Sequence, residues 1–137
     1  MSTWIYEAFE SHLSGRAGIT ELEQNVTEKL ESLGQRAEYA KIAMSNIIGG
    51  IARAVVYYPE TAITVSPGQP LSGWVKGDVN LIADSADTAR YHEEMYQGIA
   101  ELLSSLSEAQ AARSQLAATA CKNGYATVTV WYPTEAA

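Results

Sequence analysis

The chain has 137 residues, of which 47% are hydrophobic, and this fits one globular domain with a hydrophobic core. Its single cysteine excludes an internal disulfide framework, and one cysteine with two histidines leaves no zinc-ligand spacing. The formal net charge is −7 and the nine Lys and Arg residues are scattered, which excludes a basic stripe for nucleic acid.

The first expected element is a short amphipathic helix within residues 1–15. Its apolar face holds Trp4, Ile5, Ala8, Phe9, His12 and Leu13. Ser14-Gly15 is expected to end it. Such a helix packs either on its own subunit or on a neighbouring one. Trp4 and Phe9 are therefore candidate interface residues.

The second expected element is a long helix over residues 20–57. Thr20 and Glu23 have the spacing of a capping box, which predicts a helix start there. Apolar residues recur at three- and four-residue steps through this range, which corresponds to a helix of about 50 Å. Gly34 and the pair Gly49-Gly50 interrupt the pattern, and they favour a kink, a close backbone approach or a break.

A β-hairpin region is expected over residues 61–83. Residues 61–66 alternate between apolar and polar, Pro67-Gly68 predicts a turn, and residues 71–75 would be the returning strand. A further turn is expected at Gly77-Asp78, before a third short strand.

A second long helix is expected over residues 85–122. The cluster Asp84–Asp87 offers N-caps, and Asn123-Gly124 offers a left-handed exit. Apolar residues at heptad-like steps predict a seam for another helix, so a coiled coil is one interpretation. The candidate interface residues on this seam are Met95, Ile99, Leu102, Leu106, Arg113 and Leu116.

The seam has two interpretations. It packs on the first long helix as an antiparallel hairpin within one subunit, or it joins subunits of an oligomer. The charge of Arg113 on the seam favours the oligomer, because polar core positions often fix register or partner number. After this helix, alternation over residues 125–133 predicts a C-terminal strand that joins the sheet.

An internal repeat is a further hypothesis. Residues 18–22 resemble residues 98–102, and Val56-Tyr57-Tyr58-Pro59 resembles Val130-Trp131-Tyr132-Pro133. A duplicated helix-then-strand unit would explain both matches, although short matches between common residues also arise by chance.

Residues that could carry chemistry are few. His12 and His92 lie on apolar helical faces and are interpreted as structural. Cys121 lies near a helix end, without the helix N-terminus that would lower the pKa of its thiol. Neither a phosphate-binding loop nor a metal-ligand motif is found. We therefore predict no catalytic, cofactor-binding or metal-binding residue, and not an enzyme.

The sequence thus predicts one α+β domain with two long antiparallel helices, a short N-terminal helix and a small antiparallel sheet. The first hypothesis is an acidic, non-enzymatic structural or assembly subunit of a homo-oligomer, for instance a phage connector, tail or decoration protein in contact with other structural proteins. The alternatives are a dimeric adaptor or secretion-type chaperone, and a ligand-binding domain or enzyme with a pocket lined by Trp74, Tyr57, Tyr58 and Trp131. No signal peptide or membrane span is expected, so the localisation would be cytoplasmic, or the virion if phage-encoded.

Overall fold

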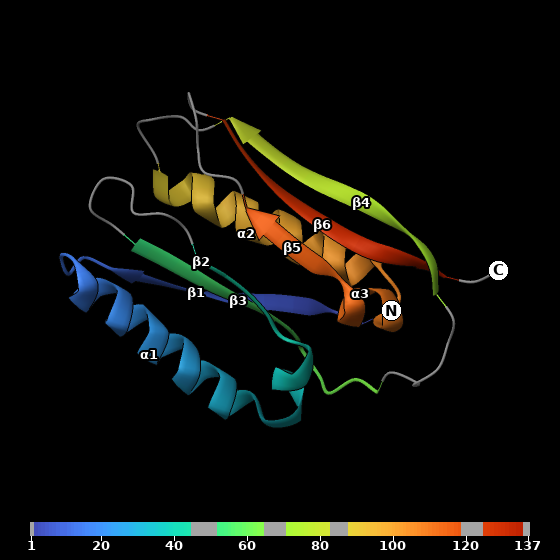
Figure 1. Cartoon of the computed structure of the whole chain (residues 1–137), viewed down its shortest axis with the longest axis horizontal. Helices are drawn as coiled ribbons and strands as arrows, with labels where there is room; N and C mark the ends of the chain where they lie inside the picture. The colour runs from blue at the N-terminus through green and yellow to red at the C-terminus, as the bar shows by residue number, and fades with distance from the viewer. Residues whose placement is uncertain (1, 45–51, 65–70, 83–87, 119–124, 136–137) are drawn as a thin grey trace.

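A computed structural model of the protein describes residues 2–44, 52–64, 71–82, 88–118 and 125–135 (Figure 1). Helices and strands are mixed along this part of the chain, so the fold is α+β. The elements are β1 (Trp4–Ser11), α1 (Arg16–Leu33), the 3₁₀ helix η1 (Gly34–Tyr39), β2 (Lys41–Met44), β3 (Ala52–Pro59), β4 (Leu71–Ile82), α2 (Thr88–Ser105), α3 (Glu108–Arg113), β5 (Gln115–Ala118) and β6 (Tyr125–Glu135).

The described elements form two units with the same topology. The first unit contains β1, α1, η1, β2 and β3, and the second contains β4, α2, α3, β5 and β6. Each unit forms an antiparallel three-stranded sheet in which the last strand lies in the middle. The strand order is β1-β3-β2 in the first sheet and β4-β6-β5 in the second.

The residue pairing across the strands also repeats, so positions in the two units can be matched. Each middle strand contains a Val-aromatic-Tyr-Pro sequence, and each first strand places a tryptophan opposite the proline. The matched pairs are Trp4 with Pro59 and Trp74 with Pro133, then Lys41 with Tyr57 and Gln115 with Trp131.

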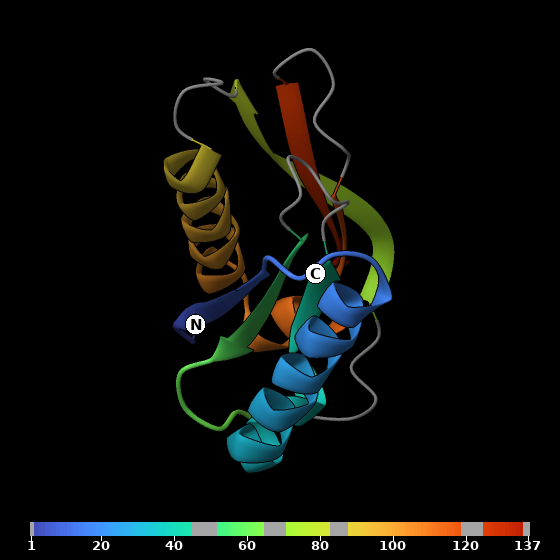
Figure 2. The same cartoon turned by 90° about the vertical axis from the view of Figure 1, so that its left-hand side faces the viewer.

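The elements stack with α1 on one face of the first sheet and α2 on the other face, between the first sheet and the second sheet; the two sheets also meet where β5 lies beside β2 (Figures 1 and 2). Leu22 of α1 packs with Val56 of β3 in one core, and Ile99 of α2 packs with Val130 of β6 in the other. Val56 and Val130 are matched positions, so each helix covers the same face of its own sheet. The second core also includes Tyr57 on the opposite face of the first sheet, and α2 therefore joins the two units.

The N-terminal helix expected within residues 1–15 is wrong, because residues 4–11 form strand β1. Ile5 and Phe9 pack towards α1, whereas Trp4 and Tyr6 pack towards α2. β1 therefore has apolar side chains on both faces of its first half, and over so few residues periodicity cannot distinguish such a strand from a helix.

The long helix expected over residues 20–57 is also wrong. α1 begins at Arg16, before the expected capping box, and ends at Leu33. The next residue, Gly34, has a φ of +60°, which a glycine adopts at little cost. Residues 52–59 form β3, in agreement with the strand propensity of Val55–Tyr58. Gly49-Gly50 lies outside the described residues.

The second long helix expected over residues 85–122 is shorter than predicted. α2 ends at Ser105, and Ser107 then begins α3 with a capping box, in which it exchanges two 3.2 Å hydrogen bonds with Gln110. The apolar pattern continued past this break because Leu116 of β5 also packs against the core. The expected caps at residues 84–87 and the exit at residues 123–124 lie outside the described residues.

The central hairpin expected over residues 61–83 is wrong within the described residues. Residues 61–64 form no strand, and β4 runs straight through Gly77-Asp78 and pairs with β6. β6 covers the range in which alternation predicts the C-terminal strand. The molecule is therefore two stacked sheet-and-helix units, and not two long antiparallel helices with a small sheet.

The strand part of the proposed sequence repeat coincides with the structural repeat, and the helical part does not. Residues 56–59 and 130–133 occupy matched positions of β3 and β6. Gly18 lies near the start of α1, whereas Gly98 lies beyond the middle of α2. Since the two units share topology and register, the repeat is visible in the backbone more clearly than in the sequence.

Candidate protein interface

One face of the second sheet carries exposed aromatic side chains. Trp74 of β4 is 57% exposed and Trp131 of β6 is 41% exposed, and their register makes them diagonal neighbours on the same face. Lys76 and Gln115 lie on either side of Trp131 and are exposed as well. We call Trp74, Lys76, Gln115 and Trp131 the open face, and such adjacent aromatic side chains are typical of protein contact surfaces.

The matched face of the first sheet is buried inside the molecule. Trp4 and Tyr57, which match the two exposed tryptophans, are 3% and 1% exposed and belong to the core formed with α2. Lys41, which matches Gln115, donates a hydrogen bond of 2.7 Å to the carbonyl oxygen of Ala112 at the second unit. In the first sheet this face is buried against the second unit. The matched face of the second sheet, the open face, is exposed to solvent.

A β-bulge at Gly73 brings Trp74 onto the open face. The pairing of β4 with β6 shifts between Ser72 and Trp74, so Gly73 is the extra residue, and its φ is +71°. Side chains alternate between the two faces of a strand, and one inserted residue therefore moves every following side chain to the other face. Without the bulge, Trp74 would lie on the face that packs on α2.

The opposite end of the stack is polar. Five polar residues of α1, which do not pack on the first sheet, are exposed: Glu23, Gln24, Thr27, Glu28 and Glu31. By contrast, α2 lies between the two sheets and has a wide buried surface, which includes Met95, Tyr96, Ile99, Ala100 and Leu103.

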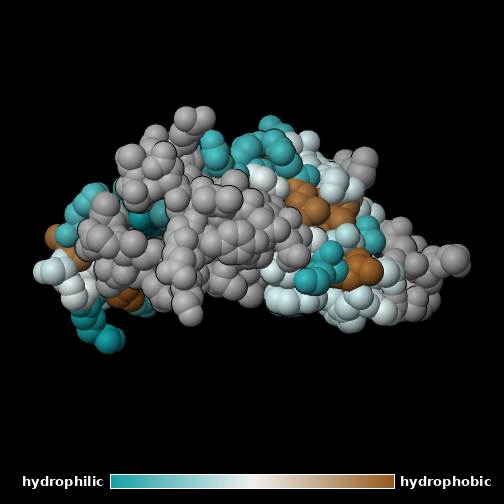
Figure 3. All heavy atoms as spheres, turned by 90° about the horizontal axis from the view of Figure 1, so that it is seen from above, coloured by the Kyte–Doolittle hydropathy of each residue, from teal (hydrophilic) through white to brown (hydrophobic). Residues whose placement is uncertain are grey.

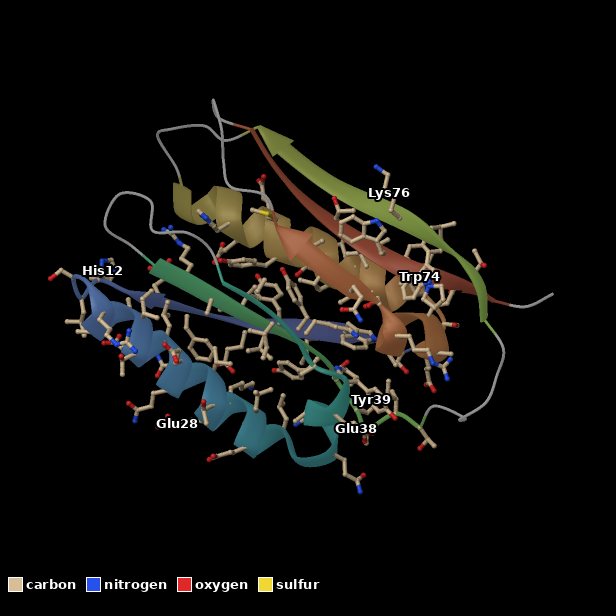
Figure 4. All side chains as sticks on the ribbon, in the orientation of Figure 1. His12, Glu28, Glu38, Tyr39, Trp74 and Lys76 are labelled. Atoms are coloured by element: carbon tan, nitrogen blue, oxygen red, sulfur yellow. The ribbon has the colours of Figure 1, made fainter. Side chains whose placement is uncertain are left out.

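A polar outer surface on a terminal unit prevents further stacking in repeat proteins. Figure 4 shows Glu28 at the α1 end of the molecule and Trp74 and Lys76 at the other end. Seen from above, on the side of β4, hydrophobic patches lie among hydrophilic side chains (Figure 3). The molecule therefore has a polar, charged surface at the α1 end and an exposed aromatic surface on the second sheet.

The interface residues expected from the sequence lie elsewhere. Most of them pack in the core between the two sheets, Phe9 packs under α1, and Arg113 is half-buried at the end of α3. The core group is Trp4, Met95, Ile99, Leu102, Leu106 and Leu116. These side chains hold the two units of one chain together, and no seam for a second helix is formed among the described residues.

The sequence interpretation assigned Trp74 and Trp131 to a possible pocket and did not predict that they share an exposed face. The signal was present in the sequence of β6, because Trp131 follows Thr127 and Thr129 at every second position and is thus a large aromatic residue in an otherwise polar set. For Trp74, the face of the strand could not be predicted, because it depends on the bulge at Gly73 and a glycine alone does not specify a bulge.

The aromatic pocket expected from the sequence is not formed. Tyr57 is in the core between the sheets, and Tyr58 packs under α1, where the Lys29 Nζ lies 4.6 Å from its ring centroid. Trp74 and Trp131 lie on the open face. These four side chains therefore surround no common cavity.

Two groups of ionisable side chains in the interior have shifted pKa values. Burial raises the pKa of the Tyr57 hydroxyl, and it raises that of Tyr96 to about 12. Burial also lowers the pKa of Lys41 from 10.5 to about 8. The tyrosine hydroxyls stay protonated at neutral pH and cannot act as bases there, and the Lys41 ammonium is held by a backbone carbonyl.

The two histidines are not brought together. His12 is exposed after β1, with its Nε2 at 3.7 Å from a carboxylate oxygen of Glu10, and His92 is buried in α2. Cys121 lies outside the described residues. Within the described ranges, no group of three or more His, Cys, Asp or Glu residues could hold a metal ion, and no helix is long and apolar enough to cross a membrane.

Comparisons with protein families, with curated proteins and with solved structures find no match to this chain. The arguments for its function therefore rest on the geometry of the two units and of the open face.

Proposed function

We propose that the protein is a non-enzymatic assembly subunit that forms a two-fold homodimer through the open face. The observation that carries this proposal is the matched pair of faces. The face of the first sheet with Trp4 and Tyr57 is buried against the second unit, whereas the matched face of the second sheet, with Trp74 and Trp131, is exposed to solvent.

A second copy must use the same face. Head-to-tail stacking would place the outer side of α1, with Glu23, Glu28 and Glu31, on the open face of the neighbouring copy. Lys76 is the one cation of that face, so at least two of the three carboxylates would be buried without a partner, which is costly. A two-fold arrangement instead places the tryptophans of one copy against those of the other. The expected assembly is therefore a closed dimer and not a filament.

The sheet offers most of the area that this dimer needs. β4 and β6 are each about 40 Å long and β5 is about 14 Å long, and with strands spaced about 4.8 Å apart they present a face of about 400 Å² per copy. Stable interfaces bury about 600 to 1,000 Å² per partner, and accessible area exceeds the flat projection because side chains protrude. The two indoles supply about 250 Å² of the exposed area of each copy.

Light scattering on the purified chain over a range of concentrations tests the proposal. The wild type is expected to reach the mass of a dimer and no more. Trp131→Thr removes about 100 Å² of apolar surface per copy and should weaken the dimer at least 100-fold. Leu13→Ser is the control, because Leu13 is 52% exposed but lies outside the open face.

Two results would contradict the proposal. A wild-type chain that stays monomeric at the highest soluble concentration would show that the open face does not bind a second copy. A dimer that is weakened equally by Trp131→Thr and Leu13→Ser would place the contact elsewhere.

A further inference from the structure

A cleft of about 510 Å³ lies between the edge of β1 and α2. Residues 3–6 line one side, and Gln97, Glu101 and Ser104 of α2 line the other. The three α2 residues follow a four- and three-residue spacing, so they form one stripe along the helix. This cleft belongs to the first sheet and is separate from the open face, so it is a second candidate site.

Hydrogen bonds show which backbone groups face the cleft. The Glu60 N–H donates to the carbonyl oxygen of Thr3 at 2.8 Å, so the backbone groups of Thr3 face β3. The Trp4 N–H donates to the Ser104 hydroxyl at 2.8 Å, so those of Trp4 face α2. Backbone groups alternate along a strand, and the N–H and carbonyl of Tyr6 therefore also face away from β3.

β1 is an edge strand of the first sheet, and no described strand pairs with its outer side. The Ser104 hydroxyl accepts the Trp4 N–H and donates its own proton to the carbonyl oxygen of Ala100 at 2.8 Å, so it occupies the backbone donor at one end of this edge. From Tyr6 onwards the edge presents a donor and an acceptor at every second residue. An extended peptide is the ligand that satisfies such a row, by adding a strand to the sheet.

The charge of the cleft selects the side chains of the peptide. Glu101 is the charged residue of the lining and is exposed, and Gln97 donates a hydrogen bond of 3.3 Å to its carboxylate. Glu93, one turn before Gln97, is exposed on the same side of α2. A peptide strand beside β1 would place alternate side chains along these carboxylates, which favours lysine or arginine.

We infer that the cleft between β1 and α2 binds an extended cationic peptide, which pairs with β1 at Tyr6 and places a basic side chain at Glu101. The backbone supplies the affinity for an extended chain, and Glu101 supplies the preference for positive charge. The site does not depend on the homodimer, because none of its lining residues belongs to the open face.

The probe is a short capped peptide in which lysine and valine alternate, titrated into the full-length protein by calorimetry and amide NMR. Saturable binding is expected, with slower hydrogen exchange of the Tyr6 amide in the complex. A peptide with glutamate in place of lysine should not bind measurably. The lysine peptide with N-methylated backbone amides should bind at least tenfold more weakly, because it keeps the charge but cannot pair with β1.

The matched variants are Glu101→Lys in the cleft and Glu23→Lys on the outer side of α1. Both residues are exposed and both changes have the same effect on net charge. Glu101→Lys should weaken binding about tenfold, since it replaces an attraction by a repulsion, and Glu23→Lys by less than about twofold.

Several outcomes would overturn the inference. Binding without protection of the Tyr6 amide, or equal loss in the two variants, would show attraction to the acidic surface in general. No saturation would show that the edge takes no strand. Protection of Tyr6 that grows with protein concentration in the absence of peptide would show that a second copy occupies the edge.

Discussion

Lys41 carries a charge at the contact between the two units, and we expect this charge to make stability depend on pH. Its counterpart Gln115 is exposed, whereas Lys41 is half-buried, with its Nζ at 2.7 Å from the carbonyl oxygen of Ala112. Burial lowers the pKa of Lys41 from 10.5 to about 8. The folded protein therefore releases this proton at lower pH than the unfolded chain does.

The sign follows from proton linkage. Below about pH 8 both states hold the proton, and the contribution of Lys41 does not vary with pH. Between about pH 8 and 10.5 the unfolded state binds more protons, so the free energy of unfolding rises with pH. From pH 7 to pH 9.5 these pKa values give a gain of about 2 kcal/mol, which solvent screening at a partly exposed site reduces to about 1 kcal/mol.

Urea unfolding of the wild type and of Lys41→Met at pH 7, 8.5 and 9.5 measures this gain. The difference between the two proteins cancels the titration of all other groups. Burial raises the pKa of Tyr96 to about 12, so its titration lowers the free energy of unfolding only above about pH 10 and does not affect this range. If the two proteins showed the same change of stability between pH 7 and 9.5, the desolvation of Lys41 would be refuted.

Three substitutions test how the units are built, each by thermal or urea unfolding. Leu103→Ala removes a fully buried side chain of α2 and should cost about 2–5 kcal/mol, whereas a loss below about 1 kcal/mol would show that α2 is not packed as described. Ser107→Ala breaks the capping box of α3 and should cost about 1 kcal/mol, and an unchanged stability would contradict that cap. Gly73→Ala should cost about 1 kcal/mol, because a side chain is strained at its φ of +71°; a neutral or stabilising effect would argue against the bulge.

The strand elements were predictable where only one face is buried. In the sequence, Val128 and Val130 alternate with Thr127 and Thr129, and this alternation predicts a strand over residues 125–133, which lies within β6. β3 is buried on both faces, and β1 packs apolar side chains towards both α1 and α2, so neither strand alternates strictly between apolar and polar residues. Without alternation, a run such as Ala54–Tyr58 continues the helical spacing of the residues before it.

The open face was not predictable because it depends on how the two units stack. Trp4 and Trp74 have similar local sequences, Trp-Ile-Tyr and Trp-Val-Lys, but one is buried and the other exposed. What differs is the presence of a following unit with a helix to cover the face. The sequence shows the aromatic residue, but only the three-dimensional arrangement shows which of the two units leaves its sheet face exposed.

The most direct test of the proposed dimer follows the three tryptophan indole N–H signals by NMR while the protein is diluted. The account predicts that the signals of Trp74 and Trp131 shift together between dimer and monomer, whereas that of Trp4, 3% exposed in the core, stays constant. Trp74→Thr and Trp131→Thr assign the signals by removing one each. A shift of the Trp4 signal alone, or constant Trp74 and Trp131 signals while light scattering records dissociation, would contradict the assignment of the open face as the interface.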